Sequence, residues 1–206
     1  MSIARAERVV TSGTFSLDGE TFDVDNNVWL VGDDDEVLIV DAAHDAPAIV
    51  AAVAGRRVTA VVCTHGHDDH IGAAPALAEA TGAPVLLHPA DRELWDTVHP
   101  DRAPDGDLRD GQRLLVAGIR ARVLHTPGHT WGSCALHVPF LDAVFTGDTL
   151  FHGGPGATGR SYSDRPAILA SLRGRLLTLP GGTVVHTGHG SDTTIAAERP
   201  HVPAAP

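Results

Sequence analysis

The sequence has little cysteine, no long apolar run and a shortage of positive charge. Its two cysteines, Cys63 and Cys134, are too few for a disulfide framework, so a reducing, cytoplasmic setting is expected. No early apolar segment resembles a signal peptide, and no run reaches about 18 apolar residues, which argues against secretion and membrane spanning. With 15 basic and 26 acidic residues, the formal net charge of -11 argues against nucleic acid or an anionic membrane as the main partner.

The length and composition are those of one globular domain. Hydrophobic residues make up 43% of the chain, which is ordinary for a water-soluble fold. A chain of this size buries about 70% of its unfolded surface, which is enough for a sizeable core. We therefore expect residues 1–206 to form a single domain.

Strand-like and helix-like segments alternate along the chain. The expected strands are residues 9–15, 28–31, 37–40, 58–63, 84–88, 113–116, 119–124, 133–138, 143–146 and 183–186. The expected helices are residues 47–54, 73–80, 91–98 and 168–178, and the expected loops are residues 99–111 and 153–159. Each half of the chain has strands followed by a helix, which suggests two packed sheets with helices outside.

One stretch, Thr64-His65-Gly66-His67-Asp68-Asp69-His70, concentrates the chemistry. Three imidazoles and two carboxylates follow directly after a buried strand, and Gly66 is expected to let the backbone turn. Neutral imidazole and carboxylate are the usual protein ligands of zinc and related metals. Open α/β sheets also place their ligands at strand carboxyl ends. The stretch therefore predicts a divalent-metal site, and a merely polar loop is the less favoured interpretation.

Three further ligand candidates share one pattern: a strand end, a glycine, then a side chain that can bind metal. They are His129, Asp148 and His189. The glycine is expected to allow a tight turn that directs the next side chain into a shared cleft. With His65, His67, Asp69 and His70, the candidates become five histidines and two aspartates. One metal takes about three or four protein ligands, so this set suits two metals that share a carboxylate.

In this order, the motifs resemble those of the metallo-β-lactamase superfamily. The best match is its glyoxalase II-like (hydroxyacylglutathione hydrolase-like) branch. The resemblance rests on residues 64–70, 126–130, 145–151 and 187–190, and it runs from about Asp23 to Ile195. It implies an α/β fold, the four-layer αββα sandwich.

The resemblance also implies a role for each candidate. One metal would be held by His65, His67 and His129, and the other by Asp69, His70 and His189. Asp148 would bridge the two metals. Asp41, at the end of strand 37–40, would orient ligands by hydrogen bonding. The expected cofactor is a pair of divalent ions, zinc in the first instance, with iron or manganese as alternatives because His/Asp sites accept all three.

The implied chemistry is hydrolysis. A water held by two divalent ions loses its proton near neutral pH, and the ions polarise a scissile carbonyl. Asp69 is expected to be catalytic, binding metal through one oxygen and orienting the hydroxide through the other. The sequence thus predicts a dinuclear metallohydrolase acting on a small thioester, without a protein nucleophile.

The sequence departs from full-length glyoxalase II after His189. That family carries a helical C-terminal domain that helps to hold glutathione, and we expect none here, with residues 200–203 forming a tail. The thiol that carries the acyl group can therefore be one other than glutathione. Residues expected to contact substrate are Arg160, Tyr162 and His152.

Two alternatives stay open, and so does the oligomeric state. A persulfide dioxygenase of the same superfamily would hold one iron through His65, His129 and Asp148, and the ligand set does not exclude it. A non-catalytic metal-binding module would be expected to have lost ligands, whereas this set is complete. True β-lactamases with similar motifs would lack the Asp148-type bridge.

Overall fold

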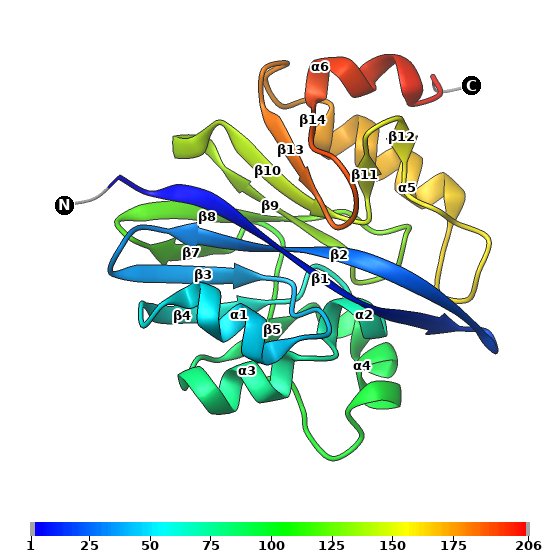
Figure 1. Ribbon diagram of the computed structural model, residues 1–206. Helices are drawn as coiled ribbons and strands as arrows, with labels where there is room; N and C mark the ends of the chain where they lie inside the picture. Colours follow the sequence, from blue (N-terminus) through cyan, green and yellow to red (C-terminus); the bar gives the residue numbers. More distant parts are fainter. Residues whose placement is uncertain (1–2, 205–206) are drawn as a thin grey trace.

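The structure is a computed structural model that describes residues 3–204. Two six-stranded sheets pack face to face, and helices cover the outer face of each (Figure 1). The first sheet has the order β1-β2-β3-β4-β5-β6, and the second has the order β14-β13-β10-β9-β8-β7. The predicted αββα sandwich is confirmed.

The elements alternate along the chain much as expected. The strands of the first sheet are β1 (Arg5–Leu17), β2 (Glu20–Gly32), β3 (Glu36–Val40), β4 (Arg57–Val62), β5 (Val85–Leu87) and β6 (Gly106–Asp107). Those of the second are β7 (Arg113–Val116), β8 (Ile119–His125), β9 (Cys134–Val138), β10 (Ala143–Gly147), β13 (Val184–Thr187) and β14 (Thr193–Thr194). A small ribbon pairs β11 (Leu150–Phe151) with β12 (Gly154–Pro155). The helices are α1 (Ala46–Val53), α2 (Asp68–Ile71), α3 (Ala74–Thr81), α4 (Arg92–Val98), α5 (Arg165–Ser171) and α6 (Ile195–Glu198).

Three apolar clusters hold the four layers together. Neighbouring residues of β2 point to opposite faces of the first sheet. Leu30 therefore joins the cluster beneath α1 and α3, whereas Trp29 joins the cluster between the sheets. Ile168 of α5 and Val185 of β13 belong to the third cluster, between the second sheet and its helices.

The strand directions position the candidate ligands. β3, β4 and β5 run parallel in the first sheet. In the second, β10 runs parallel to β13, and β8 shares their direction because β8 and β10 are both antiparallel to β9. The candidate ligands follow the carboxyl ends of these strands: Asp41, residues 64–70, His129, Asp148 and His189. A shared site at strand carboxyl ends is the usual arrangement in open α/β sheets.

The first hairpin is much longer than expected. The sequence predicted strands only at 9–15 and 28–31, but the ladder runs from Arg5 opposite Gly32 to Leu17 opposite Glu20. Asp18 and Gly19 join the strands with φ of 54° and 78°, as a tight hairpin turn requires. The outer half was missed because its side chains are largely exposed and form no apolar run.

Two other expectations needed correction. The helix predicted at 168–178 begins at Arg165, where Asp164 accepts a hydrogen bond from Ala167 N, and it continues beyond Ser171 as a π-helical segment. Residues 200–203 are not a tail, because Val202 is buried in the third cluster and Arg173 donates to Pro203 O. Several elements of two to four residues were too short to produce a periodic pattern. Within residues 3–204, no helix has the length and apolarity needed to cross a membrane.

Candidate metal centre

Three histidines from the loops that follow β4 and β8 lie close together. His65 Nε2 lies 3.0 Å from His67 Nδ1, and His129 Nε2 lies 3.1 Å from the same atom. All three side chains are buried. The structure thus brings together the residues that the sequence assigned to one metal.

A second group lies beside the first, around the helix α2. His70 Nε2 is 3.1 Å from His189 Nε2 and 3.4 Å from Asp69 Oδ2, and His189 Nε2 is 3.2 Å from that same oxygen. These are the residues that the sequence assigned to the other metal. Asp68, their neighbour, is directed elsewhere and accepts a hydrogen bond from Ser16 N of β1.

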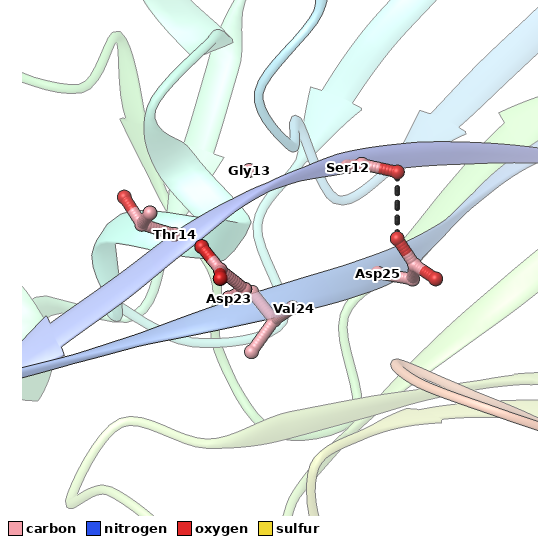
Figure 2. A pocket seen from close by; sticks show the side chains of 6 residues that line it. All are labelled: Ser12, Gly13, Thr14, Asp23, Val24 and Asp25. Carbon is pink, nitrogen blue, oxygen red and sulfur yellow. Dashed lines mark hydrogen bonds between the residues drawn. The ribbon is translucent and has the colours of Figure 1, made fainter.

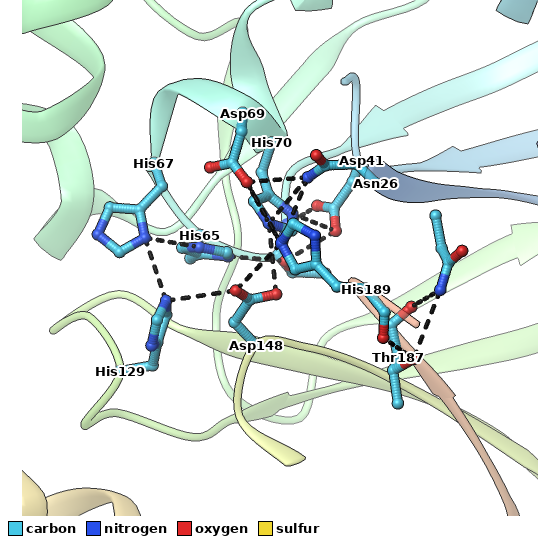
Figure 3. A network of polar contacts seen from close by, with 12 residues as sticks. Asn26, Asp41, His65, His67, Asp69, His70, His129, Asp148, Thr187 and His189 are labelled. Atoms are coloured by element: carbon cyan, nitrogen blue, oxygen red, sulfur yellow. Dashed lines mark hydrogen bonds and ion pairs between the residues drawn. The ribbon is translucent and has the colours of Figure 1, made fainter. Parts of the chain in front are cut away.

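Asp148 lies between the two groups (Figure 3). Its Oδ1 is 3.3 Å from His70 Nε2, and its Oδ2 is 3.6 Å from His129 Nε2 and 3.4 Å from His189 Nε2. One carboxylate therefore faces both groups, which is the position that a bridging ligand needs.

The outer ring nitrogens are bonded to the protein, which fixes how the rings are turned. His129 Nδ1 donates to Ala157 O at 2.9 Å, and His189 Nδ1 donates to Asp25 O at 2.7 Å. His70 Nδ1 contacts Asp41 Oδ2 at 2.9 Å. When the outer nitrogen carries the proton, the inner nitrogen presents a lone pair, which is the form that binds metal.

Asp41 organises the loop after β4 from an unusual backbone conformation. Its φ of 64° lies in the left-handed region, which a non-glycine residue seldom adopts. Asp41 Oδ1 accepts from Thr64 N at 2.7 Å, and Oδ2 accepts from Thr64 Oγ1 at 3.1 Å. That same hydroxyl contacts His65 Nδ1 at 3.1 Å, so Asp41 steadies His70 directly and His65 through Thr64.

The electrostatics favour a cation at this position. Burial, with the neighbouring His129, lowers the pKa of His67 to about 3, so this imidazole stays neutral. Burial alone would lower the pKa of His189, but the carboxylates of Asp148 and Asp69 raise it to about 10. Although burial opposes the shift, His70 and His189 hold the pKa of Asp69 well below its usual range. The carboxylates are thus anionic, and they attract positive charge.

The donor set fits a metal. Three histidine nitrogens meet at about 3 Å, and a single shared proton cannot satisfy all their lone pairs, whereas a cation can. Asp148 Oδ1 is buried and has no hydrogen-bond partner among the described residues. Such an orphaned oxygen in a native structure calls for a ligand, and a divalent ion supplies one.

Asn26 is a site residue that the sequence reasoning missed. Its Nδ2 donates to Asp69 Oδ2 at 2.9 Å, and its Oδ1 lies 2.7 Å from His44 Nε2. His44 in turn packs against Gly13, where a Cβ would come within 2.2 Å of the imidazole ring. The only signal was a pair of polar residues, Asn26 and Asn27, at the start of an apolar run.

A surface hollow of about 450 Å³ lies along β1 and β2 near Gly13, lined by residues 12–14 and 23–25 (Figure 2). Ser12 Oγ donates to Asp25 Oδ1 across the two strands at 2.6 Å. None of the predicted metal ligands lines this hollow. It therefore belongs to the hairpin surface and not to the metal centre.

A smaller cavity of about 110 Å³ adjoins the three-histidine group. His67 and His129 form part of its wall, and Phe15 and Leu17 of β1 form another part. The remaining side is closed by Ala157, Thr158, Arg160, Ser161 and Ser163. Phe15 lies with its ring centroid 5.0 Å from that of His67. The cavity thus joins an apolar surface to the candidate metal ligands.

The three predicted substrate residues have different placements. Arg160 lines the cavity, but its guanidinium pairs with Glu20 Oε2 at 2.7 Å and lies over the Phe22 ring. Tyr162 is directed to Glu93, to which its hydroxyl donates at 3.1 Å. His152 is exposed in the turn between β11 and β12. Neither Tyr162 nor His152 belongs to the cavity lining.

The sequence matches the metallo-β-lactamase superfamily over residues 21–189. The chain belongs to the metallo-β-lactamase superfamily. This membership, with the His/Asp groups described above, makes the protein a metal-dependent hydrolase of a superfamily that binds divalent metals.

Similarity to particular superfamily members extends over most of the chain. Hydroxyacylglutathione hydrolase GloC of Haemophilus influenzae is 31% identical over 194 residues, covering 84% of this chain and 89% of that protein. "Probable metallo-hydrolase YqgX" of Bacillus subtilis is 32% identical over 191 residues, covering 86% and 90%. The crystal structure of TTHA1623 in a di-iron-bound form has a TM-score of 0.78 and 34% identity, covering 87% and 95%.

Proposed function

We propose that the protein is a dinuclear metal-dependent hydrolase that cleaves small acyl thioesters. The observation that carries the proposal is the position of Asp148 between two groups of candidate ligands. Each group has three side chains that can bind a metal. The similarity to a hydroxyacylglutathione hydrolase supports the thioester chemistry. The similarity to a structure with two irons supports the metal count and keeps iron open beside zinc and manganese.

The seven ligands are proposed to divide as the geometry groups them. One ion would be held by His65, His67 and His129, the other by Asp69, His70 and His189, and Asp148 would contact both. When bound, such a pair of ions supplies an acidified water as nucleophile and polarises the substrate carbonyl.

The protein's own groups would set the geometry of the reaction. Asn26 Nδ2 holds Asp69 Oδ2 at 2.9 Å, so the carboxylate cannot rotate freely. Asp69, kept anionic by its neighbours, would accept a hydrogen bond from the attacking water and orient it. The rings of His70, His129 and His189 are fixed through their outer nitrogens, which leaves little rearrangement during catalysis.

The cavity supports a small, uncharged acyl group as substrate. Phe15 and Leu17 offer an apolar wall within reach of the metal-facing histidines. Arg160, the arginine in the cavity lining, is already paired with Glu20, so a substrate carboxylate would compete with that partner. A neutral hydroxyacyl or short acyl chain would meet no such competition.

The test couples metal analysis of the purified protein to a substrate panel. We expect two divalent ions per chain and hydrolysis of short acyl thioesters at rates above those for lactones and phosphodiesters. S-lactoylglutathione is included with coenzyme A and other carrier thiols, because the carrier is open. A single iron, together with sulfite formed from glutathione persulfide, would establish the dioxygenase alternative and reject the hydrolase proposal.

One variant distinguishes metal-dependent activity of this protein from the activity of a contaminating enzyme. His67→Ala removes a ligand of the three-histidine group, and its activity on every substrate is expected to fall by a factor of about 100 or more. Full activity in this variant would reject the mechanism. The cytoplasmic location, the single domain over residues 1–206 and the absence of nucleic-acid partners stay predictions.

A further inference from the structure

Asp91 is a buried carboxylate that no motif singled out. It lies where a short 3-10 helix meets the start of α4, and the residue is only 1% exposed. No arginine pairs with it among the ion pairs of the described residues. Burying a carboxylate without a cationic partner costs free energy unless hydrogen bonds compensate for the lost water.

The compensating hydrogen bonds come from the two loops that carry the three-histidine group. Asp91 Oδ2 accepts from Gly66 N at 2.8 Å and from Thr130 Oγ1 at 2.6 Å. Asp91 Oδ1 accepts from Gly132 N at 2.6 Å. Gly66 stands between His65 and His67, and Thr130 directly follows His129, so each of the three histidines is a chain neighbour of a group that Asp91 holds.

Both glycines are needed to admit this carboxylate. A Cβ on Gly132 would come within 2.6 Å of Asp91 Cγ, and a Cβ on Gly66 would come within 2.8 Å of Leu94 Cβ and 3.0 Å of Asp91 Cβ. Neither glycine has a positive φ, so close packing against Asp91 and α4 is the reason for each, and not the shape of a turn. Gly66 is therefore required for this packing and not for a left-handed backbone conformation.

The other three candidate ligands, Asp69, His70 and His189, are held by residues other than Asp91. His70 contacts Asp41, His189 donates to a backbone carbonyl of β2, and Asp69 accepts from Asn26. No hydrogen bond of Asp91 reaches these three residues or their chain neighbours in the described structure. The contacts of Asp91 are therefore confined to one half of the metal centre.

We infer that Asp91 is a positioning residue for the metal held by His65, His67 and His129. By tying the loop after β4 to the loop after β8, its carboxylate sets the separation of ligands that come from different sheets. This inference rests on the proposed two-metal function. Removing the hydrogen-bond partners that orient metal ligands weakens metal binding by roughly 10–100-fold, and here the loss should fall on one ion alone.

The experiment is a Co²⁺ titration of metal-depleted protein, followed by absorption, with unfolding by urea measured in parallel. His129→Gln and His189→Gln, each of which removes one trio's ligand, identify which binding event belongs to which site. Asp91→Asn keeps the size of the side chain but leaves one acceptor oxygen for three donors. Asp105→Asn is the matched control, because Asp105 also accepts a backbone N–H, from Val85, at a site away from the centre.

The expected result is that Asp91→Asn weakens Co²⁺ binding at the site that His129→Gln abolishes, by roughly 10–100-fold. Its Co²⁺ affinity at the other site should stay within about threefold of the parent's. Thr130→Val, which removes the hydroxyl donor, should weaken the same event, and Thr130→Ser, which keeps it, should bind as the parent does. If Asp91→Asn does not fold, the Thr130 pair decides the question alone.

Two results would overturn the inference. The first is unchanged binding at both sites in Asp91→Asn, or in Thr130→Val if the aspartate variant is unfolded. The second is an equal loss at both sites that tracks a fall in the free energy of unfolding, which marks a purely structural role. If the parent protein binds only one Co²⁺, the dinuclear proposal is rejected. The role of Asp91 is then judged on whether His129→Gln abolishes the binding of that one ion.

Discussion

Gly188 lies directly against the carboxylate of Asp148. A Cβ on Gly188 would come within 2.2 Å of Asp148 Oδ1 and 2.8 Å of His70 Cε1. The loop after β13 thus leaves no room for a side chain at Gly188 beside the proposed bridging ligand. Because Gly188 has no positive φ, the contact itself is what requires glycine at this position.

Gly188→Ala should therefore disturb the metal centre more than the fold. The added methyl group must displace Asp148 or move the loop that carries His189, so we expect metal affinity to fall by roughly 10–100-fold. Metal content after dialysis against a weak chelator gives the measurement. Gly182→Ala is the control, since a Cβ there meets nothing within 4 Å. Parent-like metal retention in Gly188→Ala would show that Asp148 is not held by this contact.

The sequence pattern indicated which candidate ligands would lie together but not the reasons for their glycines. His129, Asp148 and His189 each follow a strand end and a glycine, and they come close together because parallel strands end at one edge. Gly128 and Gly147 do have positive φ, as a turn requires. Gly188 is needed for a contact between segments far apart in the chain, and no local pattern reports such contacts.

Glu20→Gln should change which substrates the cavity accepts. Freed from Glu20, Arg160 could pair with an anionic acyl group, so kcat/KM for a carboxylate-bearing thioester should rise a few-fold relative to a neutral one. The ion pair is largely exposed and worth about 1 kcal/mol or less, which bounds the effect. Glu79→Gln, on the exposed face of α3, is the control for the change in net charge. An unchanged ratio of the two substrates would mean that Arg160 does not reach the acyl group.

Polar contacts across the first hairpin were the least predictable part of the site. Asn26 lies on the part of β2 that precedes the apolar segment 28–31, and it contacts His44, which packs against Gly13 of β1. Asp91 gave no signal either, since an aspartate before a helix is ordinarily a cap on its surface. Buried polar side chains of this kind are recognised from three-dimensional contacts and not from composition or spacing.

His44 is expected to matter through Asn26. Replacing it by leucine removes the donor to Asn26 Oδ1, so the amide can rotate away from Asp69, and kcat should fall by roughly tenfold. His44→Gln offers an amide donor in a similar place and should recover part of the loss. Steady-state kinetics on the best thioester of the panel measure both variants, with circular dichroism to compare their folds. Equal activity of the leucine and glutamine variants would argue against a role for this hydrogen bond.

His88 should make stability depend on pH outside the metal centre. Burial, with repulsion from the stacked His125 ring, lowers the pKa of His88 to about 4. An unfolded histidine has a pKa of about 6.5, so between these values the unfolded chain binds more protons, and stability falls as the pH drops from 6.5 towards 4. In His88→Gln the free energy of unfolding should therefore fall less between pH 7.5 and pH 5, as urea titrations at both values would show. His152→Gln, in an exposed turn, should keep the parent's dependence, and the same loss in all three proteins would contradict the assignment.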